Sequence, residues 1–325
     1  EIERRLRSDT AFQWIIGDQS VDRTRLAEFR VQHVDGLSKV FTDVLGVLLQ
    51  RGLASLAIVA QDGTRVRASA SAPSFRRLAS LEECREQAAL HLKAVLAEAD
   101  EADDVLGQRV REAKARDFAA RVDAAIATIA ELVEKGQGGK KPRASTTDPE
   151  ARVMKMADGG FRPAYNIQLA TAGSPLGGPR TIACVQVTNK GSDYGSVGPM
   201  LEQIRERTGE LPACLLADGG HSDFASIEAA TALGVVPVIS PRSEKTPDNH
   251  KESDVVTAWR ERMTQPASKR LLRARASLCE LPNAHAKTRF AMASVLVRGV
   301  EKVTCIALLV ALTSNLVAHG ARLLA

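Results

Sequence analysis

Short apolar segments alternate with helical segments through the second half of the sequence, and this alternation limits the fold more than any other feature. Four of the apolar segments are short enough to be buried strands, at residues 165–171, 181–188, 213–217 and 235–239. Helices are predicted between them at residues 196–207 and 222–233. Strands and helices that alternate in this way build an α/β fold.

The first part of the sequence is predicted to be helical and to lead into a pair of strands. Residues 2–50 carry apolar side chains at helical spacing. Residues 53–60 are a short apolar run, and residues 64–70 alternate apolar and charged side chains. We therefore expect two strands that fold back on each other around Asp62 and Gly63. A hairpin followed by strands with helical crossovers makes the sheet a mixed one.

A long helical region is predicted between this hairpin and the strands of the second half. Ser80 and Glu83 have the spacing of a capping box, which would open the first helix. Helix-forming residues dominate as far as about Lys135, so two long helices are expected. Residues 137–150 have the composition of a flexible linker.

Towards the end, residues 241–256 are polar and loop-like, residues 268–281 are predicted to be a basic helix, and residues 294–323 are predicted to form terminal helices. The chain is expected to divide into five segments. These are a helical N-terminal region (1–52), the first part of the α/β domain (53–77), a helical insertion (78–136), a linker (137–150) and the remainder of the α/β domain (151–325).

Charge is unevenly distributed along the sequence, whose formal net charge is +5. Residues 82–136 carry 13 acidic and 8 basic side chains, so the rest of the chain is basic. The excess is concentrated in residues 65–77, 140–143 and 241–275. One basic segment is often only a solvated face, but three of them favour a phosphate-binding surface. The acidic insertion is expected to add little to binding of nucleic acid.

Cysteine usage and hydropathy argue against other classes of protein. The five cysteines form no CxxC pair and no cluster with histidine, which argues against a structural zinc site and a disulfide scaffold and suits a reducing cytoplasm. No apolar run reaches the about 18 residues typical of a membrane helix. The most apolar segment, residues 303–318, is predicted to be a buried terminal helix, and no membrane contact is expected.

Three acidic residues are the candidates for catalysis. Asp62 and Asp218 each lie at the carboxyl end of a predicted core strand, where open α/β sheets bind ligands. Glu280 lies on the late basic helix. If the three carboxylates converge, they suit Mg²⁺, and a pair of such ions can cleave a phosphodiester. The alternative stays open, because Asp-Gly is also a common turn signal and occurs four times in the sequence.

Motifs of several other enzyme classes are absent. The sequence contains no GxxxxGK[ST] phosphate loop, no GxSxG and no HExxH. The glycine-rich run at residues 136–141 follows no strand and is predicted to be a linker. His221, three residues after Asp218, either contacts a phosphate or leaving group or simply lines the pocket.

Six parts of the sequence carry a more specific signal. They are DTAFQWIIGDQSVDRTRLAEFR (9–30), VAQDGTRVRASASAPSFRR (59–77), DPEARVMKMADGGFRPAYNIQLAT (148–171), VTNKGSDYGSVGPMLEQIRERTG (187–209), LLADGGHSD (215–223) and ELPNAHAKTRF with VRGVEK (280–290, 297–302). Together these segments resemble the DDE transposases of bacterial insertion sequences, over nearly the whole chain.

This resemblance implies an RNase H-like catalytic domain. Such a domain has a mixed sheet flanked by helices, here with a helical N-terminal region and a helical insertion between the first and second catalytic aspartates. Its triad corresponds to Asp62, Asp218 and Glu280, which would hold Mg²⁺, with Mn²⁺ as a substitute. The N-terminal region would bind the DNA ends of the element. Because the sequence begins without Met inside a charged run, we expect that region to be truncated.

The resemblance also implies residues that contact DNA. The Glu-x6-Lys pairing of the family falls on Glu280 and Lys287, and Lys287 would contact DNA together with Arg273 and Arg275. Two further DNA contacts, Arg65 and Arg67, are expected from the basic segment near Asp62. His221 and Asn283 are expected to support the metal ligands.

Three positions depart from the pattern of the family. His221 stands where relatives often carry Tyr, and Leu272 stands where a Tyr is common eight residues before the Glu. Pro282 follows Glu280 by two residues. Because proline removes a helical hydrogen bond and clashes with the preceding turn, we expect the helix to bend or end there.

The expected function is a Mg²⁺-dependent DNA transposase that releases a 3′-OH at the end of the element and transfers it to target DNA. The alternative is a catalytically impaired, DNA-binding transposase remnant, and a nuclease without transposition is a third reading. The expected partners are double-stranded DNA, at the element ends and the target, and a second copy of the chain in a homodimer. The expected location is the bacterial cytoplasm, in association with the nucleoid.

Overall fold

The computed structural model describes residues 2–17, 19–98, 104–137, 139, 141–241 and 253–324. Its α-helices are α1 (Ile2–Ser8), α2 (Thr10–Ile16), α3 (Arg23–Gln32), α4 (Val34–Gln50), α5 (Leu78–Ala97), α6 (Val105–Glu134), α7 (Val197–Thr208), α8 (Phe224–Ala232), α9 (Asp254–Thr264), α10 (Pro266–Thr288) and α11 (Val300–Leu323). Its strands are β1 (Ile58–Arg67), β2 (Phe75–Arg76), β3 (Ala144–Ser145), β4 (Arg152–Lys155), β5 (Phe161–Ser174), β6 (Gly177–Thr188), β7 (Cys214–Ala217) and β8 (Val236–Ile239).

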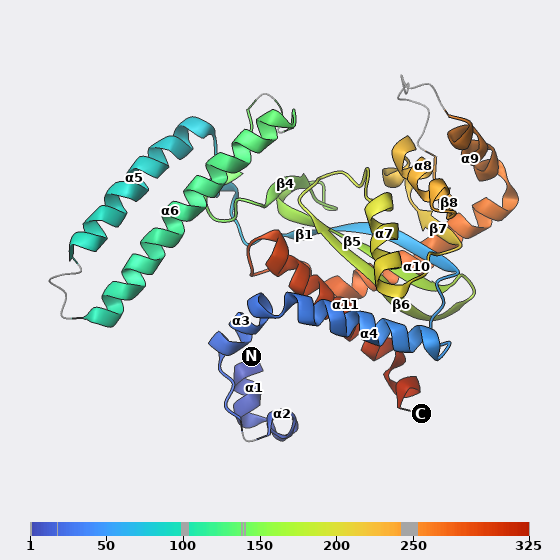
Figure 1. The fold of residues 1–325 in the computed structure, drawn as a ribbon, viewed down its shortest axis with the longest axis horizontal. Coiled ribbons are helices and arrows are strands. Elements are labelled where there is room, and N and C mark those ends of the chain that lie inside the picture. Colours follow the sequence, from blue (N-terminus) through green and yellow to red (C-terminus); the bar gives the residue numbers. More distant parts are fainter. Residues whose placement is uncertain are drawn as a thin grey trace.

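One mixed sheet forms the centre of the molecule (Figure 1). Strand β5 pairs antiparallel with β1 on one edge and with β6 and β4 on the other. Strands β7 and β8 continue the sheet beyond β1, and both run parallel to it. The prediction of a mixed sheet flanked by helices is therefore confirmed.

The hairpin predicted around Asp62 and Gly63 is wrong, because β1 is one continuous strand through both residues. Asp62 pairs with Leu169 and Gly63 pairs with Gln168 of β5. The Asp-Gly turn preference is overridden because β5 offers β1 a long partner strand. Asp62 therefore lies in the middle of β1, and not at its carboxyl end.

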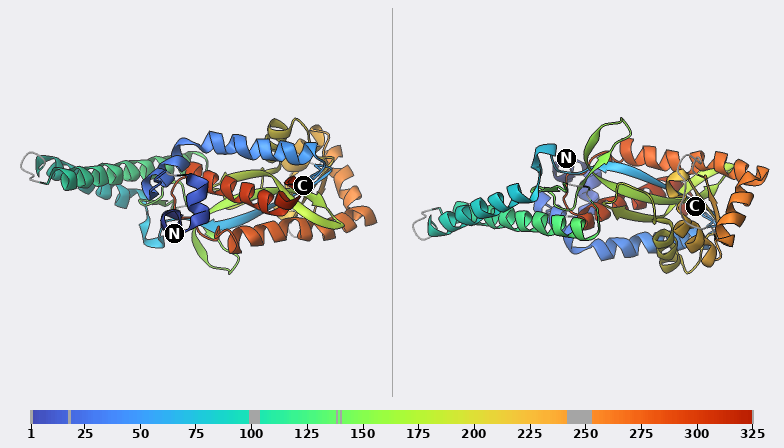
Figure 2. Two further views of the ribbon diagram at one scale, coloured as in Figure 1. Left: turned by 90° about the horizontal axis from the view of Figure 1, so that it is seen from below. Right: turned by 90° about the horizontal axis from the view of Figure 1, so that it is seen from above.

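Helices cover the two faces of this sheet. Helix α10 packs on β1 and β5, and α7 packs on β6 and on α8 (Figure 2). Neighbouring side chains of β1 point to opposite faces. Asp62 accepts a hydrogen bond from Asn283 of α10, whereas Gln61 donates one to Ser196, which precedes α7. We call these two sides the helix face of β1 and the network face of β1.

Helices α5 and α6 pack against each other and project away from the sheet as an arm (Figure 1). The predicted pair of long helices is confirmed, but its capping box is not. Helix α5 begins at Leu78, and its N-cap residue Arg77 makes no side-chain capping bond. The chain already enters the helix from β2, which pairs with β3, so the start of α5 lies before Ser80.

Helix α10 continues through Pro282, which is buried inside it. The expectation that the helix ends at this proline is therefore wrong. The face of α10 that includes Pro282 and Ala286 packs on the sheet, and this packing holds the helix across the missing hydrogen bond. Of the loop predicted at 241–256, residues 242–252 lie outside the described residues, and the loop's last residues begin α9.

Helix α11 is long and apolar enough to span a membrane by length and composition, with 44% of its most apolar window buried within the protein. Two of its polar side chains are bonded to the edge strand β6. Asn315 pairs with both backbone groups of Ile182, and His319 lies 2.8 Å from the Thr181 hydroxyl. These bonds cover the open edge of β6 and are consistent with the buried terminal helix that the sequence predicts.

Candidate active site

The sheet brings Asp62 and Asp218 together from distant parts of the chain. The parallel register pairs Val59 with Leu215 and Ala60 with Leu216. Continued for two residues, it places Asp62 opposite Asp218, whose backbone is still extended. Residues in register on parallel strands point to the same face. In agreement with this, the charge of Asp218 acts on Asp62 and contributes to the raised pKa of that carboxyl.

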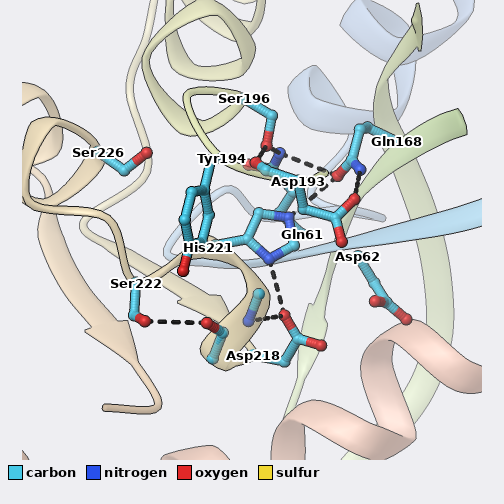
Figure 3. A network of polar contacts seen from close by, with 12 residues as sticks. Gln61, Asp62, Gln168, Asp193, Tyr194, Ser196, Asp218, His221, Ser222 and Ser226 are labelled. Atoms are coloured by element: carbon cyan, nitrogen blue, oxygen red, sulfur yellow. Dashed lines mark hydrogen bonds and ion pairs between the residues drawn. The ribbon is translucent and has the colours of Figure 1, made fainter. Parts of the chain in front are cut away.

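Helix α10 supplies the other side chains around Asp62, which points towards it (Figure 3). The Asn283 amide Nδ2 donates to Asp62 Oδ2 over 3.0 Å, and Arg275 Nη1 lies 3.9 Å from Asp62 Oδ1. Two atoms of these side chains, Asn283 Oδ1 and Arg275 Nη1, are buried without a hydrogen-bond partner among the described residues. Such orphaned groups are costly in a protein interior, and here both belong to side chains that contact Asp62.

The two aspartates have pKa values that are shifted in opposite directions. Burial raises the pKa of Asp62 above its ordinary value, against the lowering effect of Arg275. A hydrogen bond from His221 lowers the pKa of Asp218, and the backbone N–H of Gly220 adds to this effect. Pairs of carboxyl groups whose pKa values diverge in this way are typical of functional sites.

A hydrogen-bonded network on the network face holds Asp218 in place (Figure 3). His221 is fully buried, with Nδ1 2.9 Å from Asp218 Oδ1 and Nε2 3.1 Å from Gln168 Oε1. Gln61 Nε2 donates to the same Gln168 oxygen and to Ser196 Oγ. Of the two roles that the sequence left open for His221, this position favours that of a pocket residue, one that orients Asp218.

Asp193 is a further carboxylate in this network, and the sequence interpretation missed it. Its Oδ1 accepts hydrogen bonds from Asn166 Nδ2 at 2.7 Å and from Gln168 Nε2 at 2.6 Å. A Cβ atom at Gly63 would lie 2.5 Å from that oxygen and closer still to Gln168 Nε2, so a larger residue there would have to displace this network. A Cβ at Gly220 would lie 3.2 Å from Asp193 Oδ2. The glycine inside a strand was the available sign that another polar group approaches closely.

The donor atoms at this site fit a divalent cation of the Mg²⁺ type. Asp62 and Asp218 offer carboxylate oxygens, and Asn283 Oδ1 is an orphaned amide oxygen beside them. Mg²⁺ prefers such hard oxygen ligands and needs few of them from protein. Among the described residues, however, no group of three or more His, Cys, Asp and Glu side chains could hold a metal ion.

Glu280 stands apart from the aspartate pair. Its side chain is exposed on α10, one turn before Asn283, and it does not belong to a three-carboxylate group. The part of Glu280 in the site therefore stays a prediction.

Three of the five expected DNA contacts gather in one basic cavity of about 870 Å³ beside Gly63, which we call the first basic cavity. Its cationic side chains are Arg65, Arg67, Lys155 and Lys287. Burial lowers the pKa of Lys287. The other two expected contacts lie elsewhere on α10, where Arg275 faces Asp62 and Arg273 is exposed.

A comparison with known protein families gives one match. The sequence pattern described as "Transposase DDE domain" matches residues 128–316, which is more than half of the chain. The matched part contains Asp218 and Glu280, whereas Asp62 lies before it. The mixed sheet agrees with the RNase H-like fold expected for such a domain. No curated protein and no solved structure matches the chain with significant similarity.

Proposed function

This chain belongs to the family of transposases with a DDE domain, and from this premise we propose that it cleaves DNA with the help of a divalent metal and joins the freed end to target DNA. The observation that carries the proposal is the closeness of Asp62 to Asp218, whose negative charge contributes to the raised pKa of Asp62. The reaction would hydrolyse a phosphodiester at the end of an insertion sequence. The 3′-OH released in this step would attack a phosphodiester of the target.

The residues around the aspartate pair have distinct roles in this proposal. Asp62 and Asp218 would hold the metal through their carboxylates, with Glu280 as the third member of the triad. Asn283 orients Asp62 through its amide N–H and presents its free oxygen to the same space. His221 orients Asp218 and leaves the second oxygen of that carboxylate available.

Mg²⁺, or Mn²⁺ in its place, would supply Lewis-acid stabilisation of the charge that develops on the phosphate and would lower the pKa of a bound water. The cations of the first basic cavity would neutralise the DNA backbone next to Asp62. Arg275 balances the buried charge of Asp62 before the metal binds.

The alternative is a catalytically impaired, DNA-binding transposase remnant. The observation that favours it is the exposed position of Glu280, outside the aspartate pair. A remnant of this kind would retain the basic cavity and bind DNA, but it would not cut it.

Several parts of the proposal follow from the family and from the sequence. The DNA partners are double-stranded element ends and target, and the protein acts as a homodimer in the bacterial cytoplasm, associated with the nucleoid. Residues 1–52 contact element ends. Residues 53–77 and 151–325 form the catalytic domain, residues 78–136 form an arm inserted into it, and residues 137–150 link the arm to the second part of the domain.

The test is nicking of supercoiled plasmid DNA and of element-end DNA in Mg²⁺, in Mn²⁺ and in a chelator. We expect the wild-type chain to nick in either metal. Asp62→Asn and Asp218→Asn should each lower the rate by about 10⁴-fold, as removal of a central catalytic group does. Asp123→Asn, a change at an exposed carboxylate on α6, is the matched control and should be neutral. Wild-type protein that binds DNA without nicking it would favour the remnant instead.

A further inference from the structure

A second basic cavity lies at the root of the α5–α6 arm. It has a volume of about 780 Å³ and is enclosed by the carboxyl end of α6, the segment that follows it, β4 and the residues after β6. Its cationic side chains are Lys135, Lys141, Arg143, Arg152 and Lys190. Glu131 is the one acidic side chain among the described residues that line it. Segments far apart in the sequence therefore contribute charge of one sign to one hollow.

This second basic cavity adjoins the first one. Gly191 lines both cavities, and β4 contributes Arg152 to the second and Lys155 to the first. Arg65 fixes this boundary, because its Nη2 donates to the Gly191 carbonyl over 2.8 Å. A continuous row of cations thus leads from Gly63, next to Asp62, to the base of the arm.

Most of the charge in the second basic cavity is not neutralised within the chain. Lys135 pairs with Glu131 over 3.5 Å, at the exposed surface of α6. Arg152 donates to the backbone carbonyls of Pro149 and Ala151, and nearby carboxylates, among them Glu131, partly offset its charge. Lys141, Arg143 and Lys190 form no ion pair with any other described residue. Like charges gathered without counter-charges repel each other and favour a polyanion as partner.

We propose that the second basic cavity binds the sugar–phosphate backbone of double-stranded DNA, at a distance along the duplex from the phosphodiester held at Asp62 and Asp218. This proposal rests on the proposed function, because it takes DNA as the substrate of the aspartate pair. The continuity of the two cavities selects DNA over a lone phosphate ion, since only a chain of phosphates can occupy both. The proposal also gives Lys135, at the base of the otherwise acidic insertion, a part in DNA binding.

The test compares triple variants of equal charge change. Binding of a labelled random-sequence duplex is measured by fluorescence anisotropy between about 50 and 200 mM salt, in chelator so that no cleavage occurs. The variant Lys141→Ala/Arg143→Ala/Lys190→Ala removes three cations of the cavity. We expect roughly 30-fold weaker binding at low salt and a log–log salt slope that is lower by about 0.9 for each lost phosphate contact.

The matched control removes three exposed cations further out on the arm, as Lys93→Ala/Arg109→Ala/Lys114→Ala. This control should keep the wild-type affinity and salt slope. Glu131→Gln changes the charge of the cavity in the opposite direction, because it removes the acidic side chain and frees Lys135 from its ion pair. We expect it to tighten binding a few-fold and to steepen the slope, which damage to folding cannot do.

The outcomes distinguish a failure of the cavity assignment from a failure of the proposed reaction. A cavity triple variant that binds like wild type, or an arm control that weakens binding equally, overturns the assignment of the cavity. Glu131→Gln that leaves the affinity unchanged counts against it as well. If the predicted binding pattern appears while neither wild type nor Asp62→Asn nicks DNA, the cavity assignment holds and the proposed reaction fails.

Discussion

The two faces of β1 differ in how their polar side chains are connected around the two aspartates. On the network face, Gln168 uses both ends of its amide and both ring nitrogens of His221 have partners, and the amide oxygens of Gln61 and Gln186 are the atoms left without one among the described residues. On the helix face, Asn283 uses only its N–H, and Arg275 Nη1 lies buried without a hydrogen bond. Satisfied networks rigidify a structure, whereas unsatisfied buried groups carry a free-energy cost.

This difference separates two tasks within a single strand. The network face holds Asp218 and the chain after β6 in place, and the helix face contains a buried donor and a buried acceptor near Asp62 that have no partner among the described residues. Substitutions on the network face should therefore change mainly the stability of the fold. Substitutions on the helix face should change mainly the affinity for metal.

The largest effect is expected for Gln168→Leu on the network face. This change leaves His221 Nε2 buried without a partner and removes one donor from Asp193, so the free energy of unfolding should fall by about 3 kcal/mol. Gln186→Leu is the control, because Gln186 is the partner of Gln168 on β6 and its Oε1 has no hydrogen bond. Urea unfolding measures the free energy of unfolding of the two variants. Equal losses for the two variants would contradict a stabilising role of the network.

A somewhat smaller effect is expected for Asn283→Ala on the helix face. The variant loses the oxygen beside Asp62 and the hydrogen bond that orients this carboxylate, so affinity for Mn²⁺ should fall by about 10- to 100-fold. Asn283→Asp keeps an oxygen at the same place and should lose less. Titration calorimetry with Mn²⁺ alone measures this without DNA. If Asn283→Ala binds Mn²⁺ like wild type while its stability falls, the helix face is structural as well.

The pH dependence of stability gives a third, smaller effect. Because burial raises the pKa of Asp62, the stability linked to this group is fully present below its ordinary value of 3.8 and is lost as the pH rises through the raised value. Asp62→Asn should therefore stabilise the metal-free protein at neutral pH, by about 1 kcal/mol. The gain should shrink towards the acidic limit of folding. The measurement is the urea midpoint of wild type and of Asp62→Asn, at neutral pH and near the acidic limit of folding. A stability gain of the variant that grows on acidification would contradict the prediction.

The smallest effect is expected for Pro282→Val. Valine restores an amide that can donate to the Leu278 carbonyl, but α10 is already unbroken at this position. We expect a change in unfolding free energy within about 0.5 kcal/mol and a nicking rate within about twofold of wild type. A large gain in nicking would show that the proline displaces Glu280 or Asn283 from the site.

The sequence predicted the elements whose signal is local. The apolar runs that became β5, β7 and β8, and the helix-forming insertion that became α5 and α6, each carry their pattern in adjacent residues. The error at Asp62 and Gly63 has the opposite cause. The local turn preference there is outweighed by pairing with β5, about 100 residues further along the chain. No pattern in the residues around Asp62 indicates this pairing.

The candidate site was only partly predictable for a related reason. Asp62 and Asp218 were identified because both belong to apolar segments of strand character. Asp193 does not belong to an apolar segment of this kind. Its place in the site depends on hydrogen bonds from Asn166 and Gln168 of β5. Which side of α10 faces the sheet depends on packing, so Asn283 and Glu280 could not be ranked from the sequence.

The hydrogen bond between Asn283 and Asp62 joins residues 221 positions apart in the chain. At about 5 to 20 residues per second, about 10 to 40 s of synthesis on the ribosome separate these two residues. During that interval the residues of β1 have been made, but the helix that completes the surroundings of Asp62 has not. Under the proposed function, a chain that stops before α10 lacks both Asn283 and Glu280, so the capacity to cut DNA appears only when the last part of the protein has been made.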